Sequence, residues 1–73
     1  MNKDKNQIIE NINDITRRMR IAQKAGDLFV GIRLYKERKS IVEGLKAEGY
    51  GFVWDDKYEF VVDILGGPYE EET

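Results

Sequence analysis

The chain has 73 residues and contains neither cysteine nor histidine, and both facts limit its chemistry. A chain this short forms one domain with a thin core, and the missing residue types exclude disulfides, Cys- or His-based zinc sites and Ser-His or Cys-His nucleophile pairs. Residues 1–50 hold eleven Lys and Arg against seven Asp and Glu, whereas residues 51–73 hold one against seven. Three interpretations of this separation are open: attraction between copies of the chain, a basic face for nucleic acid with an acidic face for a protein, or two halves whose charges are simply solvated.

The chain opens with a polar segment, Met1 to Gln7, and contains no apolar run of the 18 or so residues that span a bilayer. We therefore expect no signal peptide and no contact with a membrane, and a cytoplasmic location. We treat residues 1–73 as a single domain.

The first predicted element is a helix over about residues 5–25. Its apolar residues follow one another at alternating steps of four and three, a narrow seam on one side of a helix; they are Ile8, Ile12, Ile15, Met19 and Ala22. Asp4, followed three residues later by Gln7, resembles a capping box at the start of this helix.

The next segment, Ala25-Gly26-Asp27, predicts a tight joint between two helices. Gly26 suits the left-handed conformation that ends a helix, and Asp27 suits the N-cap of the next one. Such a short joint makes the two helices antiparallel. The second helix is expected over about residues 28–48, because Gly49 and Gly51 end it.

The apolar residues of this second helix form two adjoining stripes, one of Leu28, Ile32, Tyr35 and Val42 and the other of Val30, Leu34, Ile41 and Leu45. Two stripes predict a central helix, covered on one side by the first helix and on the other by the segment that follows. Gly31 lies between the stripes and is expected to allow two backbones to approach closely. Arg38 also lies there, and its guanidinium must reach the rim, an internal or inter-subunit carboxylate, or a ligand.

After Gly51 the pattern changes to the alternation of strands, expected over about residues 52–55 and 58–65. Alternation directs Tyr58, Phe60, Val62 and Ile64 toward the second stripe of the second helix. The predicted fold is therefore α+β: an antiparallel helical hairpin followed by a two-stranded antiparallel β-hairpin. Because such a hairpin leaves an unpaired edge, we expect that edge to pair with a second copy in a homodimer. Residues 69–73 form an acidic tail.

The sequence offers little for catalysis. It holds no phosphate-binding loop, and Gly49-Tyr50-Gly51 lacks the remaining features of a dinucleotide fingerprint. The acidic residues of the strand region suit a turn and a solvated strand face better than an acid-base pair or a metal site; they are Asp55, Asp56, Glu59 and Asp63. We expect no catalytic residue, no cofactor and no metal.

Nucleic-acid binding is the alternative function that the sequence favours most. Two basic stripes would carry it, Arg17, Arg20 and Lys24 on the first helix and Arg33, Lys36 and Lys39 on the second. The segment from Ile21 to Tyr35 resembles a helix-turn-helix through Ala22, Gly26, Ile32 and Tyr35. It departs from that motif at Asp27, where an apolar residue is usual, and at Leu28-Phe29-Val30, where a recognition helix is polar. A looser resemblance links Met19, Ala22, Phe29 and Leu34 to the UVR-type helical hairpin.

We therefore expect a small, self-associating, non-catalytic interaction or regulatory module, an adaptor or an inhibitor that acts on a larger protein. Phe29 lies on the polar side of the second helix and is the strongest candidate for an exposed apolar contact. Arg38, Trp54 and Tyr69 are the further candidates for partner binding.

Overall fold

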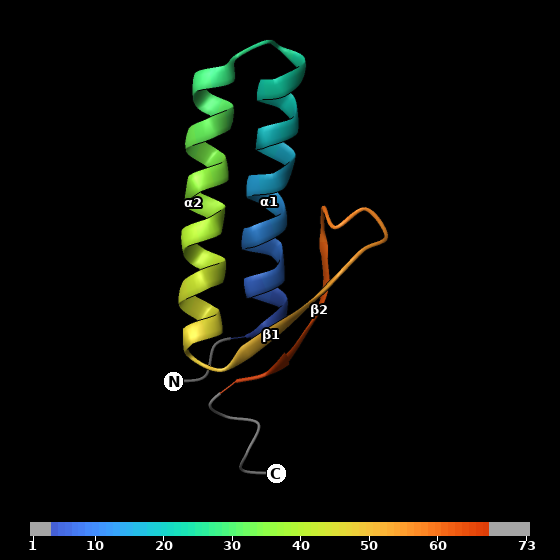
Figure 1. Ribbon diagram of the computed structural model, residues 1–73. Coiled ribbons are helices and arrows are strands. Elements are labelled where there is room, and N and C mark those ends of the chain that lie inside the picture. Colours follow the sequence, from blue (N-terminus) through green and yellow to red (C-terminus); the bar gives the residue numbers. More distant parts are fainter. Residues whose placement is uncertain (1–3, 68–73) are drawn as a thin grey trace.

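The computed structural model describes residues 4–67 and shows two helices followed by a two-stranded antiparallel sheet (Figure 1). The helices are α1 (Lys5–Lys24) and α2 (Leu28–Ala47), and the strands are β1 (Tyr50–Trp54) and β2 (Val61–Gly66). This order confirms the α+β layout predicted from the sequence. We call the two strands with their connecting loop the ribbon.

The ends of the helices follow from local hydrogen bonds. Gly26 has a φ of 77°, and the Asp27 carboxylate accepts a hydrogen bond from the Val30 amide at 3.2 Å, so both predicted roles in the joint are confirmed. At the start of α1, the Asp4 carboxylate accepts from the Asn6 amide. The predicted capping box is wrong, because the Gln7 side chain donates to Asn11 instead of turning back to Asp4.

The core occupies the lower part of the molecule in Figure 1, where both helices meet the ribbon. Its buried members come from all four elements: Ile8, Ile12, Val42, Leu45, Tyr50, Val61 and Ile64. A smaller cluster of Ile15, Met19 and Leu34 holds the two helices together farther up. The stripe of Val30, Leu34, Ile41 and Leu45 is buried or half-buried throughout.

The ribbon lies mainly against α1, contrary to the expectation that α2 is the central helix. In Figure 1, α1 stands between α2 and β2, and α2 contacts the ribbon mainly through β1. The Asn13 side chain of α1 fixes this arrangement, since it donates to the Val61 carbonyl at 3.0 Å and accepts from the Val61 amide at 2.9 Å. The upper half of α2 therefore has no ribbon over it.

The strand predicted to begin at Tyr58 begins three residues later, at Val61. Tyr58 adopts a left-handed φ of 56° in a loop closed by Asp55, whose carboxylate accepts from the amides of Lys57 and Glu59. The pairing then shifts between Val53 and Trp54, which leaves Val62 as an extra residue in β2.

This bulge overturns the predicted alternation. Val61 and Ile64 both face the core, at 2% and 0% exposure, although strict alternation places them on opposite sides. Val62 and Tyr58, which were expected to face inward, are 57% and 79% exposed.

Candidate functional site

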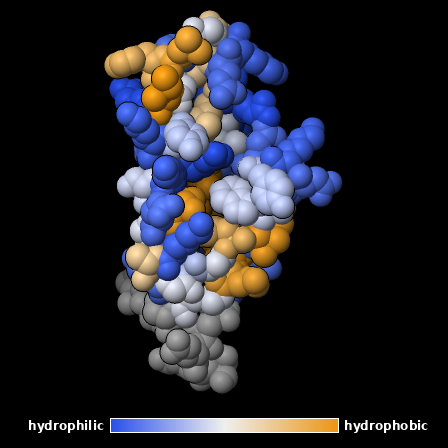
Figure 2. Space-filling view, in the orientation of Figure 1, coloured by the Kyte–Doolittle hydropathy of each residue, from blue (hydrophilic) through white to orange (hydrophobic). Residues whose placement is uncertain are grey.

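The most prominent surface feature is a group of exposed apolar side chains on the first two turns of α2. Their exposed fractions are 72% for Leu28, 80% for Phe29, 56% for Ile32 and 47% for Tyr35. Figure 2 shows apolar atoms gathered over this upper end of α2. We call these four residues the tip surface. The exposure predicted for Phe29 is confirmed, whereas the other three belong to a stripe that the sequence led us to expect in the core.

The tip surface is exposed because the ribbon ends below it. Leu28, Ile32 and Tyr35 follow at steps of four and three, so they share one side of α2 with Val42, but only Val42 lies low enough to be buried with the ribbon. The sequence signal for this surface was the spacing of Leu28, Ile32 and Tyr35, which is typical of a helix that packs against another element.

A shallow groove of about 220 Å³ runs beside the tip surface between the two helices. Gly31 forms part of it, and a Cβ built there would meet only the Gln23 Cγ, at 3.9 Å. The predicted close backbone approach at Gly31 is therefore wrong. The missing side chain instead leaves room for an apolar group from outside, next to Leu28, Ile32 and Tyr35.

Basic residues are concentrated in the part of the sequence that carries the tip surface. Between residues 17 and 39 the chain holds eight Lys and Arg against two Asp and Glu. Some of this charge is already paired: Arg17 contacts Glu10 and Asp14, Arg18 contacts Asp14, and Arg20 forms an ion pair with Glu59 of the ribbon loop.

The other four predicted basic residues are exposed and form no ion pair within residues 4–67; they are Lys24, Arg33, Lys36 and Lys39. The helices that carry them run antiparallel (Figure 1), so the crossed helices of a helix-turn-helix are not formed.

Arg38 makes its contacts within the molecule. Its guanidinium donates to the Thr16 hydroxyl at 2.8 Å and to the Glu59 carbonyl at 3.3 Å. It also lies over the Trp54 ring, 5.9 Å from the ring centroid. Arg38 therefore links α2, α1 and the ribbon, and Trp54 is half-buried beneath it. Both residues thus make contacts within the chain, and their predicted role in partner binding stays a prediction. Tyr69 lies outside the described residues.

The second apolar surface is the outer side of the ribbon. Gly51 pairs with Leu65 and Val53 with Asp63, so these residues share the sheet face that points away from the helices. Leu65 is 55% exposed, Val53 is 37% exposed, and Val62 at the bulge adds to the same region. We call Val53, Val62, Asp63 and Leu65 the ribbon outer surface. Unlike the tip surface, it is part of an acidic segment.

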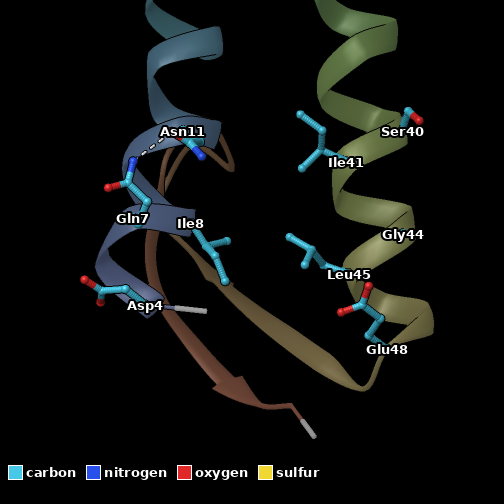
Figure 3. Close-up of a pocket in the computed structure, with 9 residues that line it drawn as sticks. All are labelled: Asp4, Gln7, Ile8, Asn11, Ser40, Ile41, Gly44, Leu45 and Glu48. Carbon is cyan, nitrogen blue, oxygen red and sulfur yellow. Dashed lines mark hydrogen bonds between the residues drawn. The ribbon is translucent and has the colours of Figure 1, made fainter. Parts of the chain in front are cut away.

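A larger groove of about 560 Å³ lies between the helices on the side away from the ribbon, which passes behind them in Figure 3. Ile8, Ile41 and Leu45 point into it from both helices (Figure 3). Asp4 and Glu48 line its lower end, and no lysine or arginine among residues 4–67 lines it. Its size is within the range of ligand pockets, but it is open along its length.

Neither a membrane span nor a metal cluster is found in the described part of the chain. No helix there is long and apolar enough to cross a bilayer. No group of three Asp or Glu side chains between residues 4 and 67 is placed to hold a metal ion. In comparisons with protein-family models, curated proteins and solved structures, nothing matches this chain.

Proposed function

We propose that this protein is a non-catalytic interaction module that self-associates and, once assembled, acts as an adaptor or inhibitor of a larger protein. The observation that carries the proposal is the tip surface. Four large apolar side chains on two turns of one helix are about half to four-fifths exposed. Contiguous apolar patches of this kind on a small protein mark contact sites.

The arrangement of the tip surface suits a protein partner. Leu28, Ile32 and Tyr35 have the 4–3 spacing by which one helix anchors in the groove of another surface. Phe29 widens the patch because it lies one turn from Ile32. The groove at Gly31 provides space for a side chain of the partner, and the basic residues around it favour a partner surface with negative charge.

The test compares two identical substitutions in different places. Ile32→Glu puts a charge in the middle of the tip surface. Ile21→Glu puts the same charge at an isolated apolar residue of α1 that is 69% exposed. Sedimentation equilibrium at 10–300 µM should show a dimer for the native chain and for Ile21→Glu, and at least about tenfold weaker association for Ile32→Glu. Circular dichroism checks that all three chains are folded. A native chain that stays monomeric throughout would refute the proposal.

Nucleic-acid binding is the competing function, and the same proteins test it. The tip surface lies in the same segment as the cations that would contact phosphates, and of its four side chains only Tyr35 carries a group that can donate to a phosphate. We expect fluorescently labelled duplex and single-stranded DNA to show no saturable binding below about 100 µM protein at 50 mM salt. Tight binding that weakens steeply with added salt would replace our proposal with a nucleic-acid role.

A further inference from the structure

We infer that the tip surface of one copy is covered by the ribbon outer surface of a second copy, and that the contact is made twice, about a twofold axis. This inference rests on the proposed function, because it names the partner of the same surface. It commits to a tip-to-ribbon contact rather than a tip-to-tip or ribbon-to-ribbon contact.

The first argument is position. The tip surface and the ribbon lie on the same face of the helical hairpin, because Tyr35 is two helical turns from Val42, which packs against the ribbon. Figure 2 shows both regions in one view, with apolar atoms over the upper end of α2 and again lower down over the ribbon. The ribbon covers the lower half of this face, and the upper half, which carries the tip surface, has no second layer over it.

A second copy turned end to end and placed face to face fills that missing layer. Its ribbon then lies on the uncovered upper half of the first copy, and the first copy's ribbon lies on the upper half of the second. The two contacts are equivalent, so the assembly is closed and stops at two copies. The two ribbons share one layer between two helical hairpins, which also brings together the strand edges expected to pair.

The second argument is charge. Of the eight basic residues in the segment that carries the tip surface, four are exposed and form no ion pair within residues 4–67: Lys24, Arg33, Lys36 and Lys39. Residues 51–67 contain four acidic residues and one lysine, and one of the acids, Glu59, is paired with Arg20 of the same chain. A tip-to-tip contact would bring two basic regions together, and a ribbon-to-ribbon contact would bring two acidic regions together. Only the tip-to-ribbon contact joins opposite charges at both of its positions.

One charged residue on each surface is placed to form an ion pair across this contact. Lys39 is exposed and lies four residues after Tyr35 and seven after Ile32, on the same side of α2. Asp63 is exposed in the middle of the ribbon outer surface, between Val53 of the paired strand and Leu65. The contact places Lys39 of each copy near Asp63 of the other, in addition to the apolar contacts of Ile32 and Leu65.

The test is a charge reversal on each side, followed by mixing. Lys39→Glu alone and Asp63→Lys alone should each weaken self-association roughly tenfold at low salt, because each turns two attractions into repulsions. An equimolar mixture of the two variants should return to native strength as a heterodimer, which native mass spectrometry identifies by mass. Arg33→Glu, the same kind of reversal on the opposite side of α2, should stay within twofold of the native chain.

Asp63 also accepts a hydrogen bond from the Ile64 amide at 2.8 Å, so Asp63→Asn is a second variant that keeps an acceptor while removing the charge. It should weaken association by about threefold. A dimer that weakens with Ile32→Glu but is unchanged by both Asp63 variants would overturn this inference and leave the proposed function intact. A monomeric native chain would refute the proposed function itself.

Discussion

Arg38 shows how one charged side chain holds three elements together. Its guanidinium contacts Thr16 of α1, the Glu59 carbonyl of the ribbon loop and the Trp54 ring. The sequence indicated that Arg38 needed a partner, because it lies between two apolar stripes. The partner itself was not predictable, since a hydroxyl 22 residues away and a backbone carbonyl leave no charge pattern in the sequence.

Replacing Arg38 should therefore loosen the ribbon as well as lower stability. Arg38→Met keeps the apolar stem but removes both hydrogen bonds and the contact with the Trp54 ring. We expect the free energy of unfolding to fall by about 1–3 kcal/mol, with a change in the emission of Trp54, the single tryptophan. Urea titration followed by fluorescence measures both.

Arg33→Met is the matched control for Arg38→Met, because Arg33 is exposed on the same helix. Its effect should stay within about 0.5 kcal/mol. Equal effects of the two substitutions would show that the Arg38 contacts contribute nothing.

At the scale of the elements, the helices and the ribbon differ in how far local sequence determined them. The joint Ala25-Gly26-Asp27 carries its own cap and its own left-handed residue, so the helix ends could be predicted from neighbouring residues alone. The register of β2 could not, because the bulge at Val62 brings Val61 against Asn13, which is 48 positions away. The pairing of Val61 with Asn13 helps to set which side chains of β2 face the core. A contact between residues so far apart cannot be predicted from the alternation of apolar residues within the strand.

Two glycines with positive φ values allow the tertiary part of this argument to be tested. Gly67 has a φ of 103° and donates to the Gly49 carbonyl, and a Cβ there would overlap the buried ring of Tyr50. Gly26 has a φ of 77° with nothing within 4 Å of its Cβ position. Gly26→Ala should cost only the left-handed backbone, about 1 kcal/mol.

Gly67→Ala should cost at least about 2 kcal/mol, because it adds overpacking against the core to the same backbone penalty. Thermal unfolding followed by circular dichroism compares the two variants. If Gly67→Ala proved as mild as Gly26→Ala, the residue that follows β2 would not be packed on Tyr50 as described.

At the scale of the whole molecule, the lower half has a core shared by helices and ribbon, whereas the upper half consists of the two helices alone. The ribbon, α1 and the lower part of α2 share one core, while the upper hairpin is held by the smaller cluster of Ile15, Met19 and Leu34, with Val30 and Ile41 packed against it. The sequence predicted the imbalance, since α2 carries more apolar surface than α1 covers. It did not predict where the uncovered part lies, because that depends on which helix the ribbon follows.

Self-association would cover the exposed apolar side chains of the upper hairpin, so the stability of the chain would depend on its oligomeric state. Burying the tip surface under a second copy stabilises the folded chain by an amount that grows with protein concentration. We expect the midpoint of thermal unfolding to rise by several degrees between 5 and 500 µM, since about 1 kcal/mol shifts the midpoint of a domain this small by 4–8 °C. Differential scanning calorimetry at several concentrations measures the rise.

Ile32→Glu separates this effect from ordinary stability. Ile32 is 56% exposed, so the substitution should change the midpoint little at 5 µM, where the chains are mostly apart. At 500 µM the variant should remain at its dilute value while the native chain and Ile21→Glu unfold at higher temperature. A native midpoint that does not move with concentration would mean that the upper half of the hairpin is stable without a partner, and the exposed side chains of α2 would then need another explanation.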